Sequence, residues 1–247
     1  MVSAAKPASK AVTVRAVNQG GERTRERILD AAEQLFSGHG LDGVSMRQIA
    51  ARAKAPLALA NYHFESKEGL YRAVLQRRAM LVSSERRALL ARAFARHAKP
   101  PIEDIFEALA RPWVELRGRP GGLAYTRLVA RETGDPAEGR RGIVRELLDP
   151  IALDFIAAME RALPDHSRAR VNWAYHFFIG ALLLILANPD RLKRLSGQVC
   201  DFESERAVIR EIVTFFSAAL AQSGPRPRAV RKTTGVASGA KSKRSKA

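Results

Sequence analysis

The stretch from Ser45 to Phe64, SMRQIAARAKAPLALANYHF, constrains the fold more than any other part of the chain. Ser45 is a favourable N-cap, and Gln48 three residues later completes the pattern of a capping box. Apolar residues then recur at helical spacing, at Met46, Ile49, Ala50 and Ala53. Pro56 is suited to the first position of a second, short helix that ends at Phe64. The pattern predicts a helix, a tight turn and another helix.

The second of these helices has a face suited to a phosphate-lined groove. Its exposed positions are expected to carry small or hydrogen-bonding side chains: Ala58, Asn61, Tyr62 and His63. No acidic residue lies between Asp42 and Glu65, whereas Arg47, Arg52 and Lys54 do. These features fit insertion into a DNA groove. By spacing and charge alone, an ordinary helical hairpin inside a bundle fits them equally well.

Helical periodicity extends over the rest of the chain, and no alternating strand pattern interrupts it, so we predict an all-α fold. The expected further helices span residues 24–37, 66–94, 102–116, 123–132, 142–163 with a break at 149–150, 167–187 and 203–222. The predicted divisions are a disordered basic arm (1–20), a helix-turn-helix DNA-binding domain (21–81, with the motif at 45–64), a helical bundle for effector binding and dimerisation (82–223) and a disordered basic tail (224–247).

The positive charge of the chain is concentrated at its two ends. Residues 224–247 contain eight Lys and Arg and no acid, and residues 1–27 contain six against two Glu, so the ends carry most of the net charge of +17. Such arms add salt-sensitive attraction to DNA that is independent of its sequence. An anionic membrane is the competing target, but neither arm has the large apolar residues of an amphipathic anchor.

Cysteine use and hydropathy predict a cytoplasmic protein without membrane association. Cys200 is the single cysteine, so no intramolecular disulfide forms and a reducing compartment fits. The first residues lack the continuous apolar segment of a signal peptide. The longest apolar run, 177–187, is shorter than the ~20 residues of a membrane-spanning helix.

The region around the helix-turn-helix stretch resembles the DNA-binding domain of the TetR family of one-component repressors, from about residue 21 to residue 81. The matching features are Ala31-Ala32, Leu35-Phe36, Gly40, Ile49-Ala50, Tyr62-His63-Phe64 and Ser66-Lys67-Glu68. The resemblance implies a homodimer that binds a double-stranded, palindromic DNA operator, because two-fold operators require two-fold proteins. It also implies a pocket in the second domain whose ligand controls DNA binding.

The resemblance also implies which residues contact DNA. They are Thr24, Arg25, Ser45, Arg47, Pro56, Leu57, Ala58, Leu59, Asn61, Tyr62, His63 and Lys67. Leu57 and Leu59 are expected against thymine methyl groups, and Asn61 and Tyr62 at bases or phosphates. Two positions depart from the family pattern. Lys54 stands where the family most often has Gly, so we expect it to adopt a left-handed conformation. Pro56 lacks the hydroxyl with which family members cap the helix.

In the family the last two helices of each protomer form the dimer interface. Candidate interface residues here are Ile179, Leu183, Leu186, Ile209, Val213, Phe216 and Leu220, which an intramolecular core would explain as well. Candidate effector-pocket residues are Trp113, Leu116, Tyr125, Arg127, Leu128, Phe155, Met159, Trp173, His176, Phe177 and Gly180. Aromatic residues at helical spacing more often belong to an ordinary hydrophobic core than to a ligand pocket. A single histidine on an apolar face, such as His176, is likewise more often a core residue than a ligand contact.

A finer resemblance concerns the ligand. APLALANYHF (55–64), LLDPIALDFIAAMERALP (147–164) and WAYHFFIGALL (173–183) are similar to a subgroup of TetR-family repressors that respond to long-chain fatty acids or acyl-CoA. We therefore expect a repressor that a small apolar effector, such as a fatty acid or acyl-CoA, releases from DNA.

Two other classes of function are the alternatives to a ligand-responsive repressor. A sequence-independent, nucleoid-type DNA-binding protein would depend on the basic arms. An enzyme would need a metal-ligand cluster, a GxSxG motif, a P-loop or a triad, none of which the sequence contains. We expect no enzymatic activity, no catalytic residues, no metal and no cofactor.

Overall fold

The computed structural model describes residues 9–222, with side chains from residue 20 onward. This part of the chain forms twelve helices and no strand, which confirms the all-α prediction. The helices are α1 (Ser9–His39), α2 (Met46–Arg52), α3 (Leu57–Phe64), α4 (Lys67–Arg96), α5 (Ile102–Arg117), α6 (Gly122–Thr133), α7 (Glu138–Arg141), α8 (Ile143–Leu147), α9 (Asp149–Ala162), α10 (Arg168–Ala187), α11 (Pro189–Leu195) and α12 (Glu205–Ala221).

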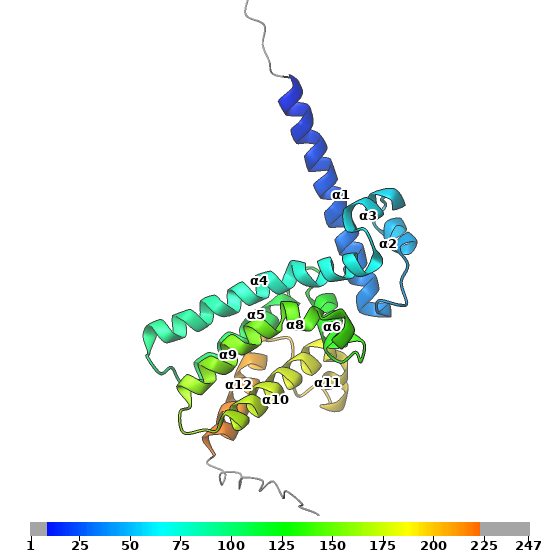
Figure 1. Cartoon of the computed structure of the whole chain (residues 1–247). Coiled ribbons are helices and arrows are strands. Elements are labelled where there is room, and N and C mark those ends of the chain that lie inside the picture. Colours follow the sequence, from blue (N-terminus) through cyan, green and yellow to red (C-terminus); the bar gives the residue numbers. More distant parts are fainter. Residues whose placement is uncertain (1–8, 223–247) are drawn as a thin grey trace, which may run out of the picture.

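The predicted helices are present, but α1 begins earlier than expected and two short helices, α7 and α11, were not predicted. Helix α1 begins at Ser9 and extends past the other N-terminal helices (Figure 1), so residues 9–20 do not form the predicted disordered arm. The break predicted at 149–150 is present one residue earlier, at Leu148, between α8 and α9. Residues 1–8 of the predicted arm and residues 223–247, which include the predicted basic tail, lie outside the described residues.

Helices α1, α2 and α3 with the start of α4 form the N-terminal unit. Its core contains Ile28, Phe36, Ile49 and Tyr71, each at most 2% exposed. The rings of Phe36 and Tyr71 meet edge to face with centres 5.1 Å apart. The long helix α4 runs on from this unit into the second domain (Figure 1), where it packs against α5. Buried apolar residues form one continuous cluster through both domains.

Helix α10 is apolar on most of its surface, and it passes through the C-terminal bundle. It packs against α5, α6, α9 and α12. Among the described helices, α10 is the one that is long enough (20 residues) and apolar enough, with a mean hydropathy of 1.4 over an 18-residue window, to suit a membrane span by length and composition. The uninterrupted apolar run, 177–187, is the C-terminal part of this helix, and its N-terminal part contains Arg168, Arg170 and Asn172. A core helix of a bundle has the same composition.

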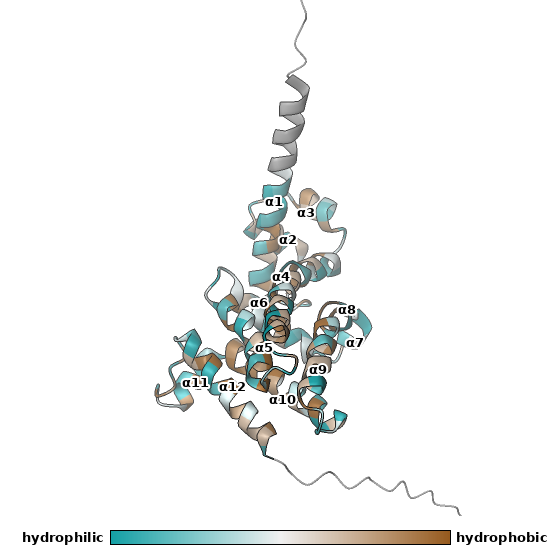
Figure 2. Cartoon of the chain, turned by 90° about the vertical axis from the view of Figure 1, so that its left-hand side faces the viewer, coloured by the Kyte–Doolittle hydropathy of each residue, from teal (hydrophilic) through white to brown (hydrophobic). Residues whose placement is uncertain are grey.

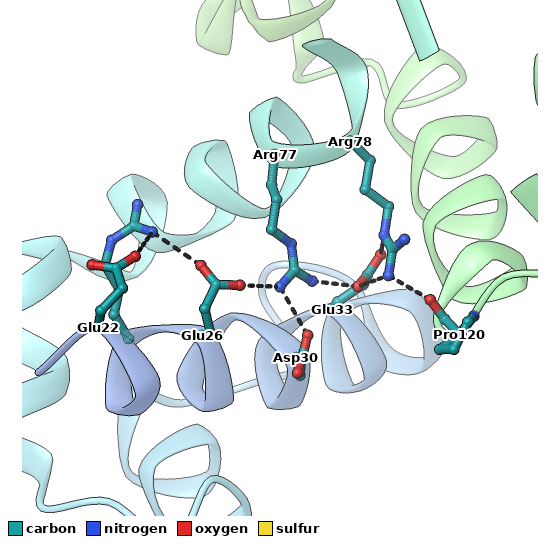
Figure 3. A network of polar contacts seen from close by, with 8 residues as sticks. Glu22, Glu26, Asp30, Glu33, Arg77, Arg78 and Pro120 are labelled. Carbon is teal, nitrogen blue, oxygen red and sulfur yellow. Dashed lines mark hydrogen bonds and ion pairs between the residues drawn. The ribbon is translucent and has the colours of Figure 1, made fainter. Parts of the chain in front are cut away.

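The buried carboxylate of Glu33 on α1 connects the N-terminal unit to the second domain (Figure 3). Arg77 Nη2 donates to Glu33 Oε2 at 2.6 Å, and Arg78 Nε donates to Glu33 Oε1 at 2.5 Å. Arg78 Nη2 also donates to the carbonyl oxygen of Pro120, at 2.7 Å, in the turn between α5 and α6. Charge-assisted, bidentate contacts of this kind are strong and geometrically specific. They fix α1, α4 and the start of α6 to one another.

Glu132 on α6 forms a second connection. Its carboxylate is 2% exposed and accepts a 2.7 Å hydrogen bond from the hydroxyl of Tyr71 on α4. Arg141 donates to both of its oxygens at 2.9 Å and reaches Asp135 at 2.7 Å. Burial and the hydrogen bond to Glu132 raise the pKa of the Tyr71 hydroxyl well above its ordinary value. The N-terminal unit and α6 are thus joined by a satisfied polar network inside the core.

Substitution Gly121→Ala should lower the free energy of unfolding by about 2 kcal/mol or more. Gly121 has φ +75°, and a Cβ there would overlap Nη2 of Arg78 and lie 3.0 Å from Oε2 of Glu33. Urea unfolding at fixed protein concentration measures the effect. The matched control is Gly139→Ala, where a Cβ meets nothing within 4 Å; it should change stability by no more than about 0.5 kcal/mol. Equal stabilities of the two variants would contradict the packing described here.

Stability should also fall as the pH rises above about 10. The unfolded chain then releases the tyrosine proton, whereas the folded chain retains it because the pKa of Tyr71 is raised. In Tyr71→Phe the decline should be shallower, and stability at neutral pH should be lower by about 1 kcal/mol because a buried hydrogen bond is lost. Thermal unfolding at several pH values measures both effects. Tyr62→Phe, at an exposed position, should leave the slope unchanged; an unchanged slope in Tyr71→Phe would refute the prediction.

Candidate nucleic-acid interface

The start of α2 is fixed by its own sequence. The Ser45 hydroxyl oxygen accepts a hydrogen bond from the backbone N–H of Gln48 at 3.3 Å, and the Ser45 N–H donates to the Gln48 side chain at 2.8 Å. This is the predicted capping box. Ser45 and Gln48 remain exposed. The carboxamide of Gln48 is therefore held at the helix end, beside Arg47 in the first turn.

The turn between α2 and α3 depends on a left-handed residue. Lys54 has φ +50°, as its place in the motif predicted. The N–H of Ala55 donates to the carbonyl of Ala50 at 3.0 Å across this turn. Pro56 was expected at the first position of α3. It lies one residue earlier, at the N-cap position. A turn held in this way sets the angle at which α3 leaves α2.

Helix α3 has one buried and one exposed side. Ala60 and Phe64 pack into the core of the N-terminal unit at 0% and 6% exposure. The predicted contact residues on the other side are exposed: Pro56, Leu57, Ala58, Leu59, Asn61 and Tyr62. The Tyr62 side chain is the most open, at 79%. His63 is half-buried, and its ring centre lies 5.5 Å from that of Tyr62. We call this exposed side of α3, with Tyr62 at its end, the α3 face.

Basic side chains lie on either side of the α3 face. Arg47 in α2 is exposed and forms no hydrogen bond or ion pair with another residue in the described part of the chain. Lys67, in the first turn of α4, is half-buried behind the N-cap Ser66. Arg52 differs, because its guanidinium donates to Gln34 on α1 at 2.7 Å. Arg47 and Lys67 thus have charges available for phosphates, whereas Arg52 braces α2 against α1.

The two predicted contacts on α1 are engaged within the protein. The Thr24 hydroxyl donates to the carbonyl of Gly20 at 3.0 Å. Arg25 lies 3.4 Å from the carboxylate of Glu26, and its guanidinium stacks 5.4 Å from the ring centre of Phe64. Arg25 therefore holds α1 against the end of α3, and its charge is shared with acidic neighbours.

The structure divides the predicted pocket residues into two groups. Inside the second domain lie Trp113, Leu116, Tyr125, Leu128, Phe155 and Met159, each at most 2% exposed. Exposed on its surface lie Arg127, Trp173, His176, Phe177 and Gly180. Arg127 donates to the carbonyl of Ala187 at 3.1 Å, and His176 contacts the carbonyl of Asn172 at 2.8 Å. The assignment of this second group to an interior pocket was wrong.

The residues predicted for the dimer interface lie instead within the single chain. Ile179 and Phe216 are partly buried against the core, and the others are buried: Leu183, Leu186, Ile209, Val213 and Leu220. Their burial within one chain favours the intramolecular-core alternative at the five buried positions, and the interface role of Ile179 and Phe216 stays a prediction. The ambiguity has a physical reason. Helix α10 is apolar nearly all round, so its sequence does not indicate which side faces the protein interior.

The outer sides of α10 and α12 carry exposed large apolar residues. Trp173, Phe177 and Leu184 follow one line along α10, at 63%, 59% and 55% exposure, and Phe215 on α12 is 69% exposed. The rings of Trp173 and Phe177 stack with centres 5.3 Å apart. Gly180 lies in the same line, with open space where a Cβ would be. We call these five residues the α10–α12 apolar face; Figure 2 shows the hydropathy of both helices.

One buried residue of the second domain was missed. Arg86 on α4 is 3% exposed, although arginine is seldom buried without a partner. It continues a series at four-residue intervals, 70, 74, 78, 82 and 86, in which Leu70, Val74 and Val82 are also buried. Helical spacing was the signal that could have identified it. No cluster of metal-ligating side chains occurs among residues 20–222.

Two family models match the chain. One, described as "Bacterial regulatory proteins, tetR family", covers residues 28–74, and the other, "Tetracyclin repressor-like, C-terminal domain", covers residues 107–219. Together they account for more than half of the chain. The first matches the N-terminal unit and the second matches the helical domain that follows it.

Curated relatives and solved structures agree with these models. The HTH-type transcriptional dual regulator CecR of Shigella flexneri is 23% identical over 202 residues, 78% of this chain and 89% of its own. The repressor NicS of Pseudomonas putida is 41% identical over 58 residues, 24% of this chain and 27% of its own. The fatty acid degradation regulator FadR of Bacillus halodurans has the same fold, with a TM-score of 0.61 at 15% identity over 80% of this chain and 96% of its own.

The N-terminal helix-turn-helix, the helical second domain and both family models lead to one assignment. The chain belongs to the TetR family and is a DNA-binding transcriptional regulator, not an enzyme.

Proposed function

We propose that this protein is a homodimeric repressor that binds a palindromic operator through its α3 face and leaves it when a small apolar molecule enters the second domain. The observation that carries the proposal is the α3 face itself. Small, apolar and amide side chains point outward from a helix whose other side is fixed in the core, and Arg47 and Lys67 flank it. Such a face can read base edges while the basic groups position it on phosphates.

The dimer part of the proposal is supported by the α10–α12 apolar face. Exposed large apolar residues gathered on neighbouring helices are typical of protein–protein interfaces. A second copy packed on this face would cover Trp173, Phe177 and Phe215, and the pair would carry two α3 helices related by a two-fold axis. Operator half-sites one helical turn apart require such an arrangement.

The finer proposal for the ligand is a long-chain fatty acid or acyl-CoA. It is supported by the similarity of residues 55–64, 147–164 and 173–183 to the fatty-acid-responsive subgroup and by the apolar interior that Trp113, Phe155 and Met159 form. Fluorescence anisotropy on DNA from upstream of the gene, titrated with both ligand types, tests it. If the protein binds this DNA saturably but no acyl compound releases it, the repressor function stands and the proposed ligand class is refuted. Equal affinity for random DNA would instead favour a nucleoid-type protein.

Arg47→Gln should weaken operator binding by a similar factor on every sequence, because a phosphate contact carries no base information. The slope of log affinity against log salt concentration should become shallower by about one. Anisotropy titrations between low and moderate salt on operator and scrambled DNA measure both. Arg92→Gln, which removes an exposed arginine on the distal part of α4, is the control and should change neither. A loss confined to operator DNA would contradict the phosphate role.

Phe177→Arg should turn the dimer into a monomer, because it would bury an unpaired charge in the centre of the proposed interface. Operator affinity should fall at the same time. Analytical ultracentrifugation gives the mass. Leu153→Arg is the matched control, since Leu153 on α9 is 63% exposed and lies outside the α10–α12 apolar face. A Phe177→Arg protein that remains a dimer would refute the interface.

A further inference from the structure

Arg86 is a buried cation without a counter-ion. Its Nε donates to the carbonyl of Leu109 at 3.0 Å, but its Nη2 is buried and has no hydrogen-bond partner in the described structure. By contrast, Arg77, Arg78 and Arg141 are less deeply buried, and each is paired with a carboxylate. A charge buried without such a partner is costly to the folded state. A side chain kept under these conditions is a candidate for ligand binding.

The surroundings of Arg86 are aromatic. Its guanidinium carbon lies 5.7 Å from the Trp113 ring and 5.6 Å from the ring centre of Phe155. Burial lowers the pKa of Arg86 to about 10, and the nearby phenols of Tyr175 and Tyr125 oppose this shift. The residue therefore stays positively charged at neutral pH. The aromatic faces stabilise the cation partly, but they accept no hydrogen bond of ordinary strength.

Two further buried polar groups share this interior and are also unpaired among the described atoms. They are Nε1 of Trp113 and the hydroxyl of Tyr125, whose rings stack with centres 5.7 Å apart. Both are 2% exposed or less. An indole N–H, a phenol O–H and a guanidinium N–H are all donors. Three unpaired donors, one of them charged, match a ligand group that is rich in acceptors and negatively charged.

We propose that the second domain binds a carboxylic acid with an apolar body, whose carboxylate is held by Arg86 with Trp113 and Tyr125. This inference rests on the proposed function, because it specifies the molecule that would release the repressor. The carboxylate would supply the acceptors that the three donors lack, and charge-assisted hydrogen bonds to Arg86 would be its strongest contacts. Apolar side chains around them would enclose the body of the ligand.

The structure indicates where the body of the ligand would go. A cavity of about 10 Å³, no larger than one water molecule, lies beside Tyr125 and is otherwise lined mainly by apolar residues of α4, α6 and α8. The ligand must enlarge it. Helices α7 and α8 cover this side with four and five residues, of which Ile143 alone is buried. Few buried apolar side chains hold this cover, so its displacement would mainly require the polar contacts of Arg141 with Glu132 and of Glu146 with Arg72 to break.

The same site is connected to the DNA-binding unit. The N–H of Tyr125 donates to the carbonyl of Gly121 at 2.9 Å, and Arg78 joins the adjacent Pro120 to Glu33 on α1. Burial raises the pKa of the Tyr125 hydroxyl, and the charges of Glu33 and Arg78 shift this pKa in opposite directions. A carboxylate bound at Tyr125 would thus alter the contacts that fix α6 to α1. This gives the ligand a physical route to the position of the α3 face.

The test compares acids with the matching alcohols on the full-length protein. Decanoate and 1-decanol form an alkyl pair, and 3-phenylpropionate and 3-phenylpropanol form an aryl pair. Calorimetric titration and thermal shift should show that at least one acid binds ~10-fold or more tightly than its alcohol, in keeping with a charged hydrogen bond. The pair that binds tells whether the body is alkyl or aryl. Equal affinity of acid and alcohol, or binding of neither acid, would overturn the proposal.

Arg86→Met tests the residue itself, because methionine replaces the buried charge with an apolar side chain of similar length. The ligand-free variant should melt at the same temperature or higher, and its preference for acid over alcohol should disappear. Arg86→Lys should keep part of that preference. It is the variant to compare with wild type if the Met variant fails to fold. Arg92→Met, at an exposed position six residues further along α4, should behave as wild type. Unchanged acid binding in Arg86→Met would overturn the proposal.

Operator binding measured on the same samples separates the two levels of inference. Wild-type protein that prefers its operator but binds no acid would refute the carboxylate site and leave the repressor intact. Protein that binds an acid at Arg86 but has no preference for operator over random DNA would refute the proposed function instead.

Discussion

The buried carboxylate of Glu33 is the contact on which the arrangement of the two domains depends. It lies on α1, receives hydrogen bonds from Arg77 and Arg78 of α4, and through Arg78 is connected to the turn before α6. Removal of one partner from such a buried group typically costs about 3–5 kcal/mol, because the other charge is left unpaired. The N-terminal unit is therefore not free to swing on a linker. Its position follows that of α4 and α6.

This rigidity gives the second domain a way to act on DNA binding. Tyr71 and Glu132 make the second connection, so two polar networks add to the apolar core that joins α6 to the helices supporting α3. Apolar surfaces can slide at little cost, whereas paired charges have specific geometry. A ligand that shifts α6 must shift α1 and α4 with it or break one of these networks. The coupling between the domains then depends on which of the two networks, that of Glu33 or that of Glu132, breaks at the lower free-energy cost.

Helix α10 shows how one apolar helix serves two environments. Phe178 stacks on Phe106 at 4.5 Å inside the domain, while Phe177, its neighbour in sequence, is exposed in the α10–α12 apolar face. Adjacent positions on a helix point about 100° apart, so a helix with apolar residues at nearly every position presents them to the core and to the outside at once. The arginines in its first turn mark where the helix begins and not which side faces inward.

The sequence alone determined the local features of the DNA-binding unit. The capping box at Ser45 and Gln48, the left-handed Lys54, the bounds of α3 and its exposed side all follow from residue types at fixed short spacings. Only the tertiary structure decided which side of α10 is buried, that Arg86 has no acidic partner among residues 20–222, and that Glu33 and Glu132 join the domains. Caps and turns are set by neighbours in the chain, whereas burial and charge pairing depend on residues far apart in sequence that only packing brings together.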